Sequence, residues 1–112
     1  MGFINAVIQD ISNINNITGI IEKEGKLSHN INNSYRIVGV IFSGFQSENP
    51  IVVSVKPDDY DFLNLYVFQG ISGATGFKSQ IFKQKIIIET NGKIEAPIYY
   101  TILYEIVEGG GY

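Results

Sequence analysis

The closing stretch IYYTILYEIV, at Ile98–Val107, indicates what kind of fold the chain adopts. It consists mostly of β-branched and aromatic residues, which is typical of a β-strand. Apolar side chains occupy both of its alternating faces, which is the pattern of a strand covered on two sides. We therefore expect a central strand with one face on the core and the other covered by the N-terminal segment or by a neighbouring molecule. Since Tyr99 and Tyr100 are adjacent, one ring should face the core and the other outward.

Upstream of this strand, the chain is a series of short apolar runs separated by turn residues. The runs SYRIVGVIFSGF, IVVSV, FLNLYVF and SQIFKQKIIIET each resemble a strand. Asn49–Pro50 marks a turn, Asn91–Gly92 is a two-residue hairpin signal, and the glycines of QGISGATGF predict a long surface loop. Gly39 and Gly44 are expected at bulges or close approaches of the backbone.

No helical pattern alternates with these strands, which argues against a parallel α/β sheet. The strand pattern predicts a mainly β protein, an antiparallel β-sandwich or barrel, with a short N-terminal helix or arm. The expected parts are an arm at 1–26, the sandwich at 27–108 and a tail at 109–112. The expected core residues are Val38, Val40, Phe42, Val53, Leu65, Ile86, Ile88, Leu103 and Val107.

The N-terminal segment carries an isoleucine at every third position from Ile8 to Ile20. We expect a short helix over 3–12 and then an extended or irregular segment to Gly19, with a strand over Asn16–Ile21 as the alternative. On a helix, a three-residue spacing drifts by about 60° per step, so one face cannot hide all the isoleucines. Packing of this segment on its own domain is one possibility, and burial against another subunit is the other. The residues predicted at that subunit interface are Phe3, Ile8, Ile11, Ile14 and Ile17.

Charge and composition exclude several classes of partner. The chain of 112 residues has a net charge of -3, a single arginine and scattered lysines, so it lacks the basic footprint that nucleic acid requires. It has no cysteine for a disulfide or thiolate site, and no apolar run approaches the length of a membrane span. Its N-terminus lacks the features of a signal peptide, so composition alone leads us to expect a cytoplasmic location. Charged residues make up 17%, below the roughly 25% of typical domains, which favours packing against protein or sugar.

Candidate chemical sites are few, and we predict no catalytic, cofactor-binding or metal-binding residues. Asp58, Asp59 and Asp61 form the one acidic cluster, which we interpret as solvated turn residues, with calcium binding as the alternative. His29 is the single histidine, and Ser28 beside it would point to the opposite face of a strand. The tyrosines could serve an interface or stack on sugars.

The segments YRIVGVIFSGF, PIVVSVKP and KQKIIIETNGKIEAPIYYTILYEIVE resemble strand pairs of small single jelly-roll virion proteins. Such proteins are penton, spike-base or minor capsid components of tailless icosahedral viruses. The resemblance implies a single antiparallel β-sandwich of jelly-roll type. It also implies a non-enzymatic protein that is located in a virion and binds capsid neighbours. We therefore predict a structural assembly protein that forms a symmetric ring, with a pentamer as one candidate. The alternative is a carbohydrate- or peptide-binding β-sandwich module.

Overall fold

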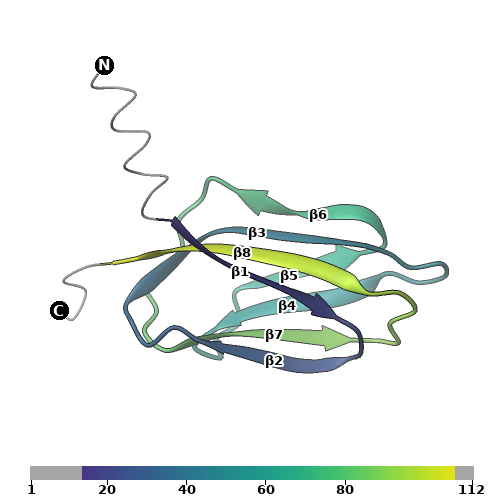
Figure 1. The fold of residues 1–112 in the computed structure, drawn as a ribbon, viewed down its shortest axis with the longest axis horizontal. Helices are drawn as coiled ribbons and strands as arrows, with labels where there is room; N and C mark the ends of the chain where they lie inside the picture. Colours follow the sequence, from purple (N-terminus) through teal and green to yellow (C-terminus); the bar gives the residue numbers. More distant parts are fainter. Residues whose placement is uncertain (1–13, 108–112) are drawn as a thin grey trace, which may run out of the picture.

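Eight antiparallel strands form two facing four-stranded sheets in the computed structural model, which describes residues 14–107 (Figure 1). Sheet A has the order β1-β8-β3-β6 and sheet B the order β2-β7-β4-β5. The first strand thus pairs with the last, the second with the seventh, the third with the sixth and the fourth with the fifth, which is jelly-roll topology. The strands are β1 (Ile14–Ile21), β2 (Gly25–Asn30), β3 (Tyr35–Phe45), β4 (Ile51–Pro57), β5 (Leu63–Val67), β6 (Gln69–Thr75), β7 (Lys85–Asn91) and β8 (Ile98–Ile106).

The sandwich expected from the sequence is confirmed, and the closing strand β8 is central in sheet A, between β1 and β3. The Tyr100 side chain is buried while Tyr99 is exposed, as their adjacency predicts. The register of β3 against β8 shifts between Ile37 and Gly39, so the bulge expected at Gly39 is present. The helix expected over 3–12 and the tail at 109–112 lie outside the described residues.

The N-terminal boundary of the sandwich differs from the prediction. Residues 14–21, which we assigned to an arm, form β1 and pair with β8 along their whole length. The backbone of this segment is satisfied by β8, and Ile21 is buried in the core, so its own domain orders it. A strand over Asn16–Ile21 was the alternative reading, and the structure extends it to Ile14. Strand β2 begins at Gly25, so β1 and the start of β2 both lie within the range 1–26 that was expected to form the arm.

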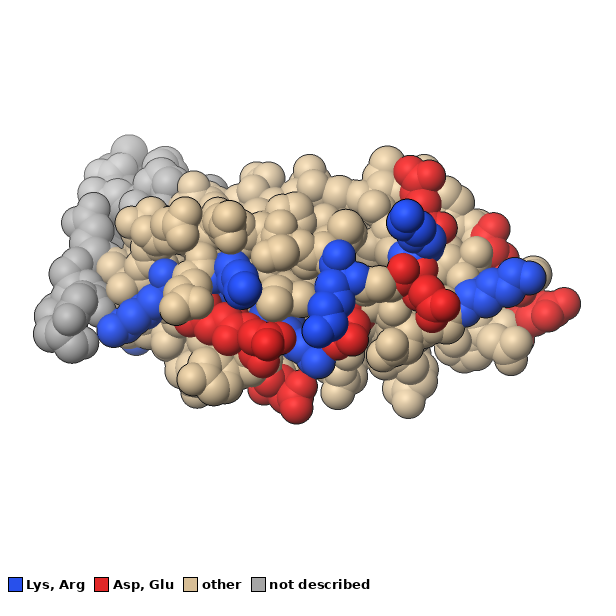
Figure 2. Space-filling view, turned by 90° about the horizontal axis from the view of Figure 1, so that it is seen from below, with Lys and Arg blue, Asp and Glu red and all other residues tan. Residues whose placement is uncertain are grey.

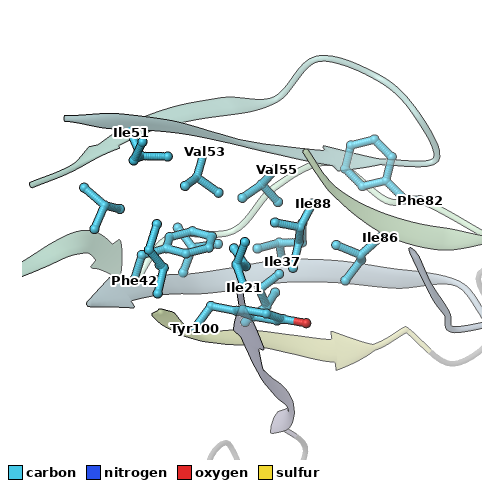
Figure 3. Packing of buried hydrophobic residues seen from close by; sticks show 14 of the residues in the cluster. Ile21, Ile37, Phe42, Ile51, Val53, Val55, Phe82, Ile86, Ile88 and Tyr100 are labelled. Atoms are coloured by element: carbon cyan, nitrogen blue, oxygen red, sulfur yellow. The ribbon is translucent and has the colours of Figure 1, made fainter. Parts of the chain in front are cut away.

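The core lies between the two sheets, where side chains from both inner faces meet (Figure 3). Of the expected core residues, Val40, Phe42, Val53, Ile86 and Ile88 belong to the buried cluster. The Leu65 side chain is partly buried against this cluster, whereas Val38 is buried outside it.

The core prediction is wrong for Leu103 and Val107, because the inward and outward positions of β8 are the reverse of those predicted. The inward residues are Ile98, Tyr100 and Ile102, so Leu103 faces out from the sandwich. Val107 lies beyond the end of β8, is partly exposed and is not part of the cluster.

The expected surface loop QGISGATGF is also wrong, because Gln69–Thr75 form β6 and pair with β3. Glycine permits this pairing where the two backbones approach closely. A Cβ atom on Gly73 would lie 2.9 Å from the Cα atom of Ile41 and 3.1 Å from the carbonyl carbon of Val40. Glycines that predict a loop in the sequence therefore support an edge strand in the fold.

The Asn91–Gly92 signal marks a turn but not a hairpin. Gly92 adopts a φ of 115°, which favours glycine. However, the flanking strands β7 and β8 belong to different sheets, so the turn begins a crossover between the layers. The hairpin prediction fails because the dipeptide reports local backbone geometry and not the strand that follows.

Candidate interaction surface

The outward face of sheet A, called the A face below, has no charged side chain over most of its length. Its residues form rows across β1, β8, β3 and β6 that the strand register defines. The three uncharged rows are Ile20–Tyr99–Ser43–Ile71, Thr18–Thr101–Ile41–Gly73 and Asn16–Leu103–Gly39–Thr75. The first charges of these strands occur in the next row, where Arg36 lies opposite Glu105.

Large apolar side chains of the A face are open to solvent. Ile71 is 79% exposed, Phe45 68%, Tyr99 55% and Ile20 48%. These residues come from four strands, so only the completed sheet brings them onto one surface. Contiguous exposed apolar surface of this kind marks interaction sites in proteins, and aromatic residues are enriched at interface centres.

Shallow hollows separate these side chains. One open hollow of about 410 Å³ is lined by residues of β1, β3 and β8, among them Thr18, Ser43, Tyr99 and Thr101. A second is lined by Phe45, Ile71 and Tyr99 together with the Ala96–Pro97 segment. Hollows beside protruding side chains allow a partner surface to interdigitate with the A face.

The outward face of sheet B is different in character. Lys26, Lys56, Lys85 and Glu89 share one face by register, and the Nζ atom of Lys56 lies 2.6 Å from a carboxylate oxygen of Glu89. The hydrogen bond and ion pair with Lys56 lower the pKa of Glu89. The two outer faces therefore differ in what they can contact. Charged groups of both signs also form a band along the edge of the sandwich on which β2 lies, seen from below in Figure 2.

The residues predicted for a subunit interface are divided between described and undescribed parts. Phe3, Ile8 and Ile11 lie outside the described residues. Ile14 is on β1 and 37% exposed on the A face, in the same row as Glu105. Ile17 points inward, is partly buried and packs against the core cluster of its own sandwich.

The single histidine connects the two sheets. His29 on β2 shares a hydrogen bond of 2.7 Å with the hydroxyl of Tyr100 on β8, joining its Nε2 atom to Oη. Burial lowers the pKa of His29 and raises the pKa of Tyr100. The Tyr100 ring lies over Gly19, where an added Cβ atom would be 2.8 Å from the Cε1 atom. The contact between His29 and Tyr100 therefore closes the side of the sandwich between β1 and β2.

Asp58 is not a solvated turn residue, and the prediction for it is wrong. Its carboxylate accepts hydrogen bonds from the backbone N–H groups of Lys83, Gln84 and Lys85 at 2.7, 2.8 and 2.9 Å. Partial burial raises the pKa of Asp58, but these donors outweigh burial, so the pKa lies below its ordinary value. The Tyr35 hydroxyl donates to the Lys85 carbonyl at 2.7 Å, and burial beside Asp58 raises the pKa of Tyr35. The Asp58 carboxylate thus joins the loop that follows β4 to residues 83–85, which lead into β7.

Asp59 and Asp61, the other members of the acidic cluster, are exposed. Within residues 14–107, no three acidic or histidine side chains gather as a metal site would require. No helix in the same range is long and apolar enough to cross a membrane.

Gln46, like Asp58, is a polar residue whose side chain holds two segments together, and the sequence analysis did not predict this role. Its side chain is 1% exposed, donates to the Ala96 carbonyl at 2.9 Å and accepts from the Glu95 N–H at 2.9 Å. Glu95 in turn accepts hydrogen bonds from the N–H and hydroxyl groups of Ser47. These contacts fix the 95–97 segment beside Phe45, at one end of the A face. A lone glutamine in a polar loop carries no signal that would reveal this role.

Comparison with known proteins identifies a fold but no family. Neither protein-family profiles nor curated protein sequences match the chain. The nucleoplasmin-like N-terminal domain of Drosophila FKBP39 is similar in structure, with a TM-score of 0.51 and 16% identity over 90% of this chain and 97% of that one. A protein of Bacillus endospore appendages, described as a novel family of disulfide-linked pili, has a TM-score of 0.38 and 16% identity over 84% of this chain and 89% of that one. At such identity the likeness shows the sandwich fold alone, and the resemblance to virion proteins is not confirmed.

Proposed function

We propose that this protein is a non-enzymatic structural subunit that assembles with copies of itself, using the A face as a principal contact surface. The observation that carries this proposal is the contrast between the two outer faces. Three consecutive rows of the A face have no charge and expose Ile71, Tyr99 and Ile20, whereas sheet B carries paired charges. Covering such apolar surface with a partner removes it from water, which is favourable.

In its finer form, the proposal is a capsid component, a penton or minor capsid protein within a symmetric ring that also contacts other capsid proteins. The jelly-roll topology and the low charge of the A face support it. Phe3, Ile8 and Ile11 belong to segment 1–13, which precedes β1, an edge strand of sheet A, in the sequence. We propose that these three residues contribute to the contact between subunits.

The proposal is tested by the mass of the particle in solution. We expect the full chain to form a stable oligomer by mass photometry and light scattering, and Phe45→Lys/Ile71→Lys to shift it to the monomer. Tyr60→Lys/Tyr66→Lys is the matched control, since those side chains are 64% and 67% exposed but lie off the A face. Circular dichroism verifies that all variants keep the β signal. A wild-type chain that stays monomeric at all concentrations contradicts the proposal.

The alternative function is a carbohydrate-binding module. The observation in its favour is that the Tyr99 ring and the hydroxyls of Thr18, Ser43 and Thr101 line one hollow. An aromatic ring beside several hydroxyl groups can stack on a sugar and hydrogen-bond to it. Binding on a glycan array that Tyr99→Ala abolishes, in a monomeric protein, would support this alternative over assembly.

A further inference from the structure

The strand β1 has an edge that no other described strand covers. Among residues 14–107, β8 pairs with one side of β1, and the sheet order places nothing on the other side. The backbone N–H and C=O groups along such an edge are a template for a further strand. Proteins usually prevent that pairing with short strands, charges, proline or irregular backbone.

The other three sheet edges carry such protection and β1 does not. Strand β2 begins at Gly25 with a φ of 138° and carries Lys26. Strand β5 has only 5 residues, and β6 contains Gly70 and Gly73 at φ values of 126° and 158°. Strand β1 has 8 residues, INNITGII, with no charge, no proline and no positive φ. It is therefore the most open edge of the described sandwich.

The side chains of β1 are complementary to themselves in one register. If two copies pair antiparallel about a two-fold axis at Ile17, then Ile14 of one copy lies opposite Ile20 of the other. Both isoleucines are on the outer side of sheet A, at 37% and 48% exposure. In the same register, Asn16 lies opposite Thr18, again on the outer side. Moving the axis by one residue in either direction leaves both isoleucines without an apolar partner in the strand.

Charge does not oppose a second copy as the occupant. Each chain has a net charge of -3, so any contact between copies has to avoid bringing like charges together. The β1 edge contributes no charge to that contact. On the neighbouring strand β8, Glu105 lies opposite Ile14 and forms an ion pair of 3.6 Å with Lys78 of its own chain.

We propose that two copies join edge to edge through β1, antiparallel about Ile17, so that sheet A continues from one molecule into the next. This inference rests on the proposed assembly function and names one of its contacts. It also places the two A faces side by side on the same side of the extended sheet, where a further partner can cover both.

Cross-linking tests the register directly, because the chain has no cysteine of its own. Asn16→Cys and Thr18→Cys proteins are mixed in equal amounts, oxidised and analysed by mass spectrometry. Directly opposite residues have Cα atoms about 4.5–5.5 Å apart, within the range of a disulfide. We expect the mixed 16–18 disulfide to exceed the 16–16 and 18–18 species. A dominant 18–18 product, or no product between β1 strands, overturns the proposal.

A charge exchange tests the β1 pairing against a contact through the A face, on which residues 16 and 18 also lie. Asn16→Lys/Thr18→Lys places like charges opposite each other twice, and we expect the dissociation constant to rise roughly tenfold. Asn16→Lys/Thr18→Glu places opposite charges there, and we expect assembly to be restored. Opposite charges at these two positions restore assembly only if the positions face each other, so a failure of both variants to assemble also contradicts the β1 contact. If both variants assemble like wild type while Phe45→Lys/Ile71→Lys does not, the β1 contact is wrong and the proposed function stands. A monomeric wild type overturns both.

Discussion

Ile102 and Leu103 are neighbours in β8, yet the structure predicts very different costs for their truncation to alanine. Each substitution removes three carbon atoms. Ile102 is 0% exposed within the core cluster, so losing these carbons costs about 2.4 kcal/mol of transfer free energy, and the cavity brings the total to about 2–5 kcal/mol. Leu103 is partly exposed on the A face, so its truncation to alanine is expected to cost about half of that transfer free energy, roughly 1 kcal/mol.

The comparison is made by urea unfolding followed by circular dichroism. Protein concentration is held constant, because assembly adds to apparent stability. We expect Ile102→Ala to lower the free energy of unfolding by at least about 1 kcal/mol more than Leu103→Ala, with unchanged m values. Equal costs, or a larger cost for Leu103→Ala, would refute the assignment of faces in β8 and restore Leu103 to the core.

Further results are expected from substitutions, added calcium and truncation. Asp58→Asn should cost about 1–3 kcal/mol, because three backbone donors lose a charged acceptor. Since folding lowers the pKa of Asp58, its contribution to stability is present above the unfolded pKa of about 3.9 and is lost as pH falls through the folded pKa. Acid unfolding of the wild type and of Asp58→Asn measures this loss. Added calcium should not raise the melting temperature of the wild type. Gly19→Ala should lower the melting temperature because its Cβ would clash with the Tyr100 ring, whereas an unchanged value would mean that the ring moves freely. Deleting 1–13 should keep the β signal by circular dichroism, whereas deleting 1–20 should lose much of it because β1 is removed.

The strand content of the protein could be predicted from particular residues. Val53, Val40 and Ile88 lie in runs of β-branched residues and are buried as expected. The phase of β8 was also available in principle. Thr101 and Glu105 share the phase of Leu103, and both indicate an outward face, but the apolar residues on that face concealed the signal.

No single segment of the sequence predicts which residues form the A face. Tyr99, Ile20 and Ile71 are distant in sequence and become neighbours only through the register of β1, β8, β3 and β6. The same is true of Asp58, whose backbone donors come from a loop more than twenty residues away in the chain. A short-range pattern contains no information about which distant backbone groups will meet a side chain.

The sequence by itself determined the class of the protein: a β-sandwich of low charge, without a cysteine framework or a basic footprint. These properties follow from composition and from local alternation, which act through each residue's own preference for a pleated, half-buried backbone. Tertiary structure alone decided that 14–21 is a strand, that 69–75 is a strand rather than a loop, and which face of β8 is inside. An edge strand is stable only when a partner satisfies its backbone hydrogen bonds, and β1 and β6 find their partners β8 and β3 far along the chain.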